Sequence, residues 1–119
     1  MFAASDNGQI SGFIALKRHS PVSIEVFVIA TRKATHGRGI GRRLVQAAED
    51  YALRNGCQLL TAKTLAPRDV EEPHLDRTRA FYRSNGFLPA ETFPTLWTES
   101  HPCLFLVKPL IDRKRAQRP

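Results

Sequence analysis

The sequence predicts an α/β fold in which a mixed β-sheet is flanked by helices. Residues 22–31 (VSIEVFVIAT) are rich in β-branched side chains and almost continuously apolar, which is typical of a central strand covered on both faces. A glycine-rich segment and a segment with helical spacing follow, and residues 58–65 (QLLTAKTL) again have the composition of a strand. Strand, glycine loop, helix and strand in this order predict a βαβ crossover.

The residues before the crossover predict a β-hairpin. Met1–Ala4 and Ile10–Leu16 are apolar, and the turn residues Asp6-Asn7-Gly8 lie between them. An Asn-Gly pair between two such runs is a strong short-range signal for a hairpin turn. Ser20-Pro21 predicts a further turn before the central strand begins.

Two helices are expected, each with a defined end. Apolar residues follow the glycine loop at helical spacing, and Asn55-Gly56 is a favourable helix stop. A shorter helix is expected over Leu75–Ser84, ending at Asn85-Gly86. The apolar positions of the first helix are Ile40, Leu44, Ala47, Ala48, Tyr51 and Ala52.

The last third of the chain is expected to be mainly extended. Phe87–Phe93 is predicted to be extended, Thr98–Pro102 to be a loop and Leu104–Val107 to be the last strand. With 119 residues the chain has the length of one domain with one core. Residues 1–110 are therefore expected to form a single domain, and the basic residues 111–119 a frayed tail.

Composition excludes several classes of protein. No apolar stretch approaches the roughly 18 residues of a membrane span and no signal-peptide pattern begins the chain, so a cytoplasmic location is expected. Cys57 and Cys103 are expected to be buried thiols, and the four histidines lack metal-ligand spacing, so no metal is expected. The net charge of +7 is compatible with a nucleic-acid-binding domain. This is the least favoured of the functional hypotheses, because the basic and aromatic residues do not interleave as in proteins that bind single strands.

The glycine loop is the first candidate site. Gly37, Gly39 and Gly41 lie directly between the central strand and the first helix. Glycines permit close approach to the main chain, and the first N–H groups of a helix attract anions such as a pyrophosphate. The loop is neither a P-loop nor the dinucleotide fingerprint, because the required Lys-Ser/Thr and third glycine are missing. The basic residues around it are Arg32, Lys33, Arg38, Arg42 and Arg43.

Two motifs carry a family resemblance. His36-Gly37-Arg38-Gly39-Ile40-Gly41 resembles the acetyl-CoA-binding signature Gln/Arg-x-x-Gly-x-Gly/Ala of the GNAT superfamily of N-acetyltransferases, with His36 as a departure. Phe81-Tyr82-Arg83-Ser84-Asn85-Gly86-Phe87 resembles the second signature of the family, an aromatic-Tyr pair followed by Gly-Phe. The resemblance covers about residues 10–110 and is closest to small bacterial-type members. It implies a splayed mixed sheet flanked by helices, in which the usual N-terminal strand and helices are absent or shortened.

The resemblance also implies acetyl-CoA as co-substrate. The pantetheine arm would pair with the backbone of residues 29–31 like an added strand. A β-bulge in the strand of residues 22–31 would free those backbone groups. The residues implied in binding acetyl-CoA are Ile29, Ala30, Thr31, His36, Gly37, Arg38, Gly39, Ile40, Gly41, Arg42 and Phe81.

Glu25 is the candidate general base. A carboxylate within a β-branched strand is unusual, because burying it is costly unless it is paired. An amine acceptor with a pKa near 10.4 must lose a proton before it attacks a thioester, and a carboxylate can accept that proton. Glu25 precedes His36 by eleven residues, as the base of the histone-acetyltransferase branch precedes the glycine motif. The alternatives are an outward-facing strand residue and a structural salt bridge.

Tyr82 matches the family position whose hydroxyl lies near the CoA sulfur, which implies a general acid for the leaving thiolate. A core aromatic residue on a helix face is the alternative. Many members carry Asn seven residues earlier, where this chain has Leu75. Trp97 could line an acceptor pocket, although core packing is at least as well supported.

The predicted function is direct transfer of the acetyl group from acetyl-CoA to a primary amine of a small molecule or peptide. The alternative is a non-catalytic CoA-binding sensor or partner subunit. Neither a nucleic acid nor a membrane is expected as a partner, and an uncovered edge strand makes a homodimer an alternative to a monomer. An acidic segment could face the acceptor or be a solvated loop: Asp69, Glu71, Glu72 and Asp76.

Overall fold

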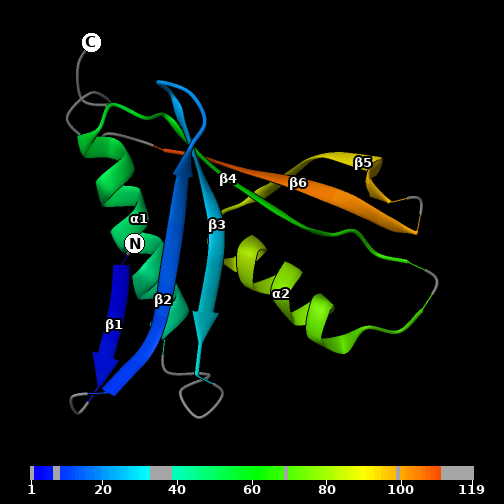
Figure 1. The fold of residues 1–119 in the computed structure, drawn as a ribbon, viewed down its shortest axis with the longest axis horizontal. Helices are drawn as coiled ribbons and strands as arrows, with labels where there is room; N and C mark the ends of the chain where they lie inside the picture. Colours follow the sequence, from blue (N-terminus) through cyan, green and yellow to red (C-terminus); the bar gives the residue numbers. More distant parts are fainter. Residues whose placement is uncertain (1, 7–8, 33–38, 69, 99, 111–119) are drawn as a thin grey trace. The chain divides into compact units, whose positions relative to one another are not determined.

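The computed structural model describes residues 2–6, 9–32, 39–68, 70–98 and 100–110. The strands of these residues form a six-stranded sheet in the order β1-β2-β3-β4-β6-β5, which confirms the predicted mixed α/β fold (Figure 1). The elements are β1 (Phe2–Asp6), β2 (Gln9–Arg18), β3 (Ser23–Thr31), α1 (Ile40–Arg54), β4 (Leu59–Leu65), α2 (Pro73–Ser84), β5 (Leu88–Thr98) and β6 (His101–Pro109).

The chain divides into two compact units. The first comprises Met1–Leu60 and Pro109–Pro119, and the second comprises Thr61–Lys108. The boundary falls within β4, so β1, β2, β3 and α1 belong to the first unit, whereas α2, β5 and β6 belong mainly to the second.

The first unit is a strand meander covered by a helix. β1 and β2 pair antiparallel from Phe2 opposite Ile14 to Asp6 opposite Gln9, which confirms the predicted hairpin. α1 packs against all three strands of this unit (Figure 1). At the edge of this packing the rings of Phe2 and Tyr51 meet edge to face, with centroids 5.6 Å apart. The core residues of the unit are Ile14, Ile24, Val26, Ile40, Leu44, Val45, Ala48, Ala52 and Leu60.

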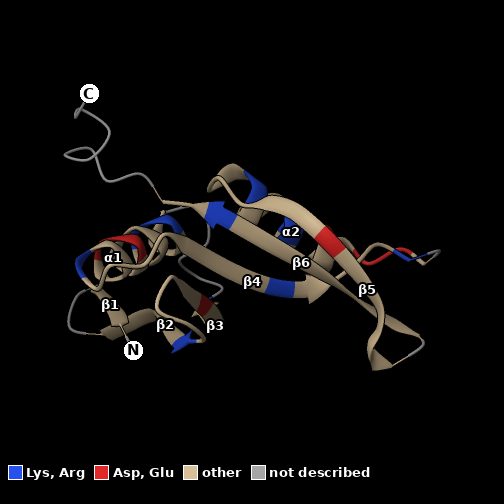
Figure 2. Ribbon diagram, turned by 90° about the horizontal axis from the view of Figure 1, so that it is seen from above, with Lys and Arg blue, Asp and Glu red and all other residues tan. Residues whose placement is uncertain are grey.

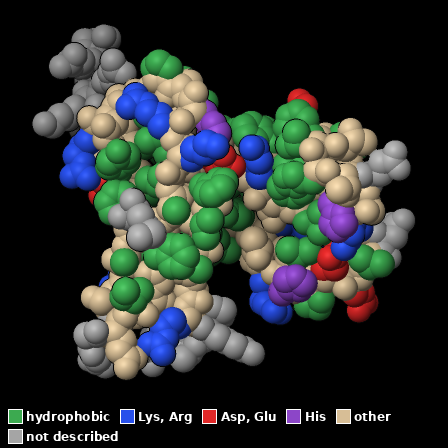
Figure 3. Space-filling model, viewed as in Figure 1, with side chains coloured by type: hydrophobic (Ala, Val, Ile, Leu, Met, Phe, Trp, Pro, Cys, Tyr) green, Lys and Arg blue, Asp and Glu red, His purple; other side chains and the backbone are tan. Residues whose placement is uncertain are grey.

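A β-bulge divides β3 into a buried half and an exposed half. Val26 lies opposite Leu16 and Val28 lies opposite Ala15, so Phe27 is the extra residue of the bulged strand. This confirms the predicted bulge. Residues 24–26 are buried, whereas Phe27 is 60% and Val28 39% exposed, so the expectation of a strand covered on both faces is wrong beyond the bulge. Hydrophobic side chains therefore gather on the surface over β2 and β3 (Figure 3).

The last residues of β3 lie against a glycine of β2. A Cβ atom at Gly12 would stand 2.7 Å from the carbonyl oxygen of Ala30 and 3.2 Å from the Cα atom of Thr31. Both of these atoms belong to the main chain, so the strands must separate to admit a methyl group. Gly12 therefore sets how closely the two strands approach.

Gly12→Ala is expected to lower the free energy of unfolding by about 1–3 kcal/mol, the usual cost of overpacking a buried position. Urea denaturation followed by circular dichroism measures the loss. Gly56→Ala is the comparison, because no atom lies within 4 Å of its Cβ position and its φ of 77° adds backbone strain alone. A Gly12→Ala midpoint equal to that of the wild type would contradict the close approach.

The second unit pairs a hairpin with a short helix. β5 and β6 are antiparallel with two register irregularities, and β6 lies beside β4, where the Ala66 N–H donates to the Pro102 carbonyl at 2.9 Å. β5 is an edge strand, and almost all of its residues are exposed. The buried residues of this unit include Thr61, Ala62, Thr64, Ala66, Tyr82, Phe87, Cys103 and Leu106.

The predicted boundaries of the last elements need correction. The expected loop Thr98–Pro102 is wrong for most of its length, because β5 extends to Thr98 and β6 already begins at His101. Both helix ends are confirmed: α1 and α2 each end at an asparagine, followed by Gly56 with φ 77° and Gly86 with φ 89°. The left-handed conformation favours glycine at these two positions.

Three smaller expectations concern the cysteines, the membrane and the tail. Cys57 and Cys103 are buried and form no disulfide, as predicted. Neither helix in the described ranges has the length and apolar character needed to cross a lipid bilayer. The predicted basic tail of residues 111–119 lies outside the described residues.

Candidate functional site

The N-terminus of α1 is the first part of the candidate site. Its N-cap residue Gly39 has φ 75° and ψ 15°, and the Gly39 carbonyl accepts a hydrogen bond from the Arg43 N–H at 3.0 Å. Among the described residues no side chain caps this end, and no acidic residue occupies the first turn, while Arg42 and Arg43 are exposed there. Basic residues on α1 are blue in Figure 2. N–H groups without helical partners, a positive dipole end and two arginines together favour an anion.

The predicted acetyl-CoA-binding residues around this end are only partly described. His36, Gly37 and Arg38 lie outside the described residues. The Ile40 side chain is 3% exposed and belongs to the core, so Ile40 can offer a ligand only its main-chain groups. Gly41 is half-buried within the first turn of α1.

The end of β3 is the second part of the candidate site. Ile29, Ala30 and Thr31 follow the bulge and pair with Ile14, Phe13 and Gly12 of β2. The first and last of these β3 residues are half-buried and the middle one is exposed. The next residue, Arg32, makes two hydrogen bonds to β2. Its N–H donates to the Ser11 carbonyl at 2.7 Å, and its guanidinium donates to Gln9 Oε1 at 2.7 Å.

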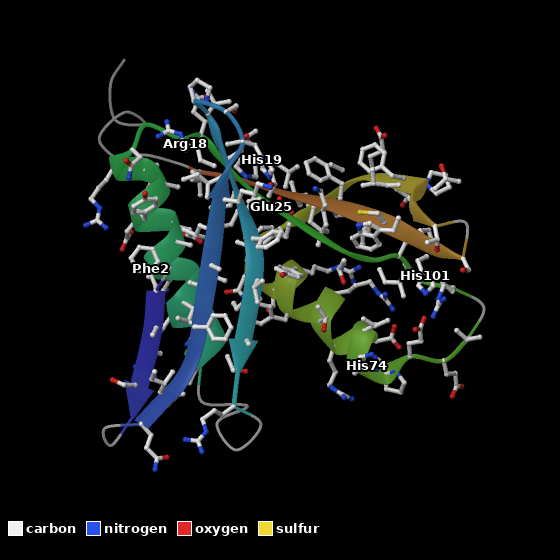
Figure 4. All side chains as sticks on the ribbon, in the orientation of Figure 1. Phe2, Arg18, His19, Glu25, His74 and His101 are labelled. Carbon is white, nitrogen blue, oxygen red and sulfur yellow. The ribbon has the colours of Figure 1, made fainter. Side chains whose placement is uncertain are left out.

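Glu25 is buried and has a histidine partner. The Glu25 side chain is 7% exposed, and its Oε1 lies 2.5 Å from Nε2 of His19, whose side chain is 41% exposed. Figure 4 shows the two side chains meeting beside β2 and β3. The outward-facing alternative for Glu25 is therefore wrong. His19 was not predicted as a site residue, although strand alternation offered a signal: His19 lies two residues beyond Lys17, which is opposite Glu25 in the register.

Tyr82 belongs to the second unit and lies in its core. The residue is 5% exposed, and its ring meets those of Phe81 and Phe87 edge to face, with centroids 5.6 and 5.1 Å apart. The second sequence motif thus forms one aromatic cluster at the end of α2. This geometry supports the core-packing alternative for the ring and leaves the role of the hydroxyl to be tested by mutation.

Two acidic residues at the start of α2 are paired with arginines. Arg68 holds the Glu72 carboxylate with two hydrogen bonds of 3.0 and 2.7 Å, and Arg79 contacts Asp76 at 2.6 Å. The hydrogen bonds from Arg68 hold the pKa of Glu72 below its ordinary value. The segment is therefore not a uniformly negative surface, because Glu72 and Asp76 both have cationic partners.

Trp97 lies near the end of β5 and is 46% exposed. Core packing, one of the two interpretations of this residue, is therefore wrong. The Phe93 and Phe105 rings, on paired strands, are 6.0 Å apart and half-buried.

Comparison with known proteins places the chain in a family. The sequence model of the acetyltransferase (GNAT) domain matches residues 1–89, which is more than half of the chain. The chain belongs to the GNAT acetyltransferase family.

Two curated relatives share about a third of their aligned residues with the chain. The uncharacterized N-acetyltransferase YhfO of Bacillus subtilis is 34% identical over 92 residues, covering 71% of this chain and 55% of the relative. The mycothiol acetyltransferase of Jonesia denitrificans is 36% identical over 91 residues, covering 73% of this chain and 26% of the relative. The chain thus spans about half of the first relative and a quarter of the second.

Solved structures share the fold at low sequence identity. A GNAT-family acetyltransferase from Desulfovibrio desulfuricans matches with a TM-score of 0.82 and 18% identity, over 92% of this chain and 68% of the other. An aminoglycoside 6'-N-acetyltransferase complexed with coenzyme A matches with a TM-score of 0.75 and 21% identity, over 93% and 72%. At these identities the likeness establishes the fold alone.

Proposed function

We propose that this chain binds acetyl-CoA and transfers the acetyl group to a primary amine. The observation that carries the proposal is the N-terminus of α1, where Gly39 is left-handed, no acidic residue is present and two arginines are exposed. An acidic first turn is the usual complement of a helix dipole, so an arginine-rich first turn favours an anionic ligand. Because the chain belongs to the GNAT family, we take this anion to be the pyrophosphate of acetyl-CoA. Residues 1–110 would act as one domain, followed by the basic tail.

The substrate would make three contacts with the chain. Its pyrophosphate would lie on the first N–H groups of α1 and on the residues of the first sequence motif, 36–41. Its pantetheine arm would pair with the main chain of residues 29–31, beyond the bulge at Phe27. Phe81, which is half-buried on α2, would be a further contact of the cofactor, as the family resemblance implies. The solved aminoglycoside acetyltransferase contains coenzyme A, which agrees with this choice of substrate.

The proposed chemistry needs one base and one acid. Glu25 would take a proton from the acceptor ammonium, so that the amine nitrogen can attack the thioester carbonyl carbon. The carbon–sulfur bond then breaks, and the Tyr82 hydroxyl would supply the proton that the thiolate takes up. Holding the amine against the thioester would provide much of the rate enhancement. The acceptor would be a small molecule or a peptide carrying a primary amine.

Tyr82→Phe is expected to lower kcat about 10- to 100-fold, at or below the lower limit for acid–base groups, because a thiolate is a good leaving group. The phenylalanine ring keeps the packing against Phe81 and Phe87, so the melting temperature should change little. Release of the CoA thiol measures kcat, and thermal unfolding is the control. An unchanged kcat would leave the Tyr82 hydroxyl with a structural role only.

The proposal is tested first by calorimetric titration of the chain with acetyl-CoA, with ATP as a comparison polyphosphate. Saturable binding of acetyl-CoA at a stoichiometry of one, with weaker binding of ATP, is expected. A panel of spermidine, kanamycin, a lysine peptide and a peptide with an unblocked N-terminus then tests transfer. Folded chain that binds no acetyl-CoA would overturn the proposal. Binding without transfer to any amine would favour the non-catalytic CoA-binding alternative.

A further inference from the structure

We propose that His19 is a positioning residue for Glu25: it holds the carboxylate through Nε2 and carries to solvent the proton that Glu25 takes from the acceptor amine. The inference rests on the proposed function, because it assigns His19 a part in the same proton transfer. No sequence motif pointed to this residue. The structure brings it to Glu25, with Nε2 and Oε1 2.5 Å apart (Figure 4).

The two side chains differ in their access to water. The side chain of Glu25 is 7% exposed and that of His19 is 41% exposed. A buried carboxylate that collects a proton in every turnover needs a route by which the proton leaves. An imidazole can accept a proton on one ring nitrogen and release one from the other. His19 therefore connects the buried carboxylate with the surface.

The neighbouring basic residues have other contacts. The Lys17 ammonium, which lies across the strand pair from Glu25, is 5.7 Å from the centroid of the Phe27 ring. The Arg18 guanidinium donates to three main-chain carbonyls at 3.1–3.2 Å, those of Ser20, Pro21 and Asn55. Among the three consecutive basic residues Lys17, Arg18 and His19, the histidine side chain contacts Glu25 Oε1.

The turn between β2 and β3 fixes the position of His19. The His19 N–H donates to the Ser23 carbonyl at 3.1 Å. The Ser20 hydroxyl accepts from the N–H groups of Val22 and Ser23 at 3.2 and 3.1 Å, and it lies 2.9 Å from the Ser23 hydroxyl. The turn is therefore ordered by its own hydrogen bonds, which keeps the imidazole beside Glu25 without help from a ligand.

The protons of the reaction balance along this route. An acceptor ammonium has three N–H protons, of which the amide product keeps one. The second leaves the nitrogen as the amide forms and replaces the proton that the Tyr82 hydroxyl gives to the CoA sulfur when the carbon–sulfur bond breaks. The third passes from nitrogen to the Glu25 carboxylate. At rest His19 donates from Nε2–H to that carboxylate, so exchange with water must first move the ring hydrogen to Nδ1. Nε2 then accepts the proton from Glu25, and Nδ1 releases one to water, which restores the resting tautomer. The net result is one proton delivered to solvent per acetyl group transferred.

The test compares His19→Gln with His74→Gln, using whichever amine of the panel the wild type acetylates. His74 is an exposed histidine at the start of α2 and has no part in the proposed chemistry. We expect kcat of His19→Gln to fall at least about 10-fold, with both KM values within about threefold of wild type, and His74→Gln to match the wild type. Added imidazole should restore part of kcat in His19→Ala and none in Glu25→Gln.

A spectroscopic measurement on the wild-type protein tests the contact even if His19→Gln folds poorly. In wild-type chain labelled with ¹⁵N-histidine, the strong hydrogen bond should place one ring N–H proton far downfield, and Glu25→Gln should shift it. An unmoved ring resonance would overturn the contact. An unchanged kcat in His19→Gln, alongside a slow Glu25→Gln, would overturn the inference and leave the proposed function standing. A wild type that acetylates no amine overturns both.

Discussion

Replacing Gly39 and Gly41 together with glutamate is expected to weaken acetyl-CoA binding at least about 100-fold and to leave the fold intact. Two carboxylates would then stand at the end of α1 where the pyrophosphate is proposed to lie. A like charge about 4 Å away costs about 1 kcal/mol in water and about 4 kcal/mol at a protein surface. At the protein-surface value, two such charges exceed the roughly 2.8 kcal/mol that corresponds to a 100-fold loss of affinity.

The same substitutions should be tolerated by the helix. Among the residues that the structure describes, the nearest neighbour of the Gly39 Cβ position is Arg42 Nη2 at 3.7 Å, so the cost there is the left-handed backbone, about 1–2 kcal/mol. Acidic residues at the positive end of α1 recover about 0.3–1 kcal/mol each. A variant that stays folded and loses the ligand therefore identifies the site, which a variant that unfolds cannot do.

Glutamine at both glycines is the matched control, because it has the size of glutamate without the charge. We expect the Gln variant to bind acetyl-CoA more weakly than the wild type and more tightly than the Glu variant, since bulk and charge both act. Calorimetry measures the three affinities, and circular dichroism checks the helix. Wild-type affinity in the folded Glu variant would move the pyrophosphate away from α1.

The parts of the fold that sequence predicted correctly are those with a strong local cause. Both helix ends depend on Asn-Gly pairs whose glycines adopt φ 77° and 89°, a conformation encoded within the dipeptide. The first hairpin likewise depends on a turn between two apolar runs. The bulge at Phe27 was expected from the family resemblance, because the composition of residues 22–31 gives no sign of it.

The parts that sequence missed depend on side-chain partners that composition does not reveal or on irregular strand pairing. β5 has two prolines and register irregularities, and its exposed position at the sheet edge removes the alternation that would mark a strand. The partner of Glu25 lies six residues away across a turn, and only the β2–β3 register brings them together. The arginine partners of Glu72 and Asp76 lie at helical spacing, a signal that the composition of an acidic segment conceals.

Glu25→Gln is expected to lower kcat about 10²- to 10⁴-fold at neutral pH, or about 2.7–5.5 kcal/mol of transition-state stabilisation. Glutamine preserves the size of the side chain and can still hydrogen-bond His19, so the fold should persist. Its amide cannot accept the proton of the acceptor ammonium. Glu91→Gln, an exposed residue of β5, is the matched control and should retain wild-type kcat and KM.

The pH profile separates a base from a structural carboxylate. At a pH below its pKa of about 10.4, an acceptor amine is mostly protonated, and its unprotonated fraction rises about tenfold for each unit by which the pH is raised. The rate of Glu25→Gln should therefore rise about tenfold per pH unit between pH 7 and 10 and approach that of the wild type. At high pH the solvent, in place of the carboxylate, removes the proton from the acceptor ammonium. A variant that is slow by the same factor at every pH would instead assign Glu25 to shaping the strand beside the bulge, and the proton would have to leave by another group.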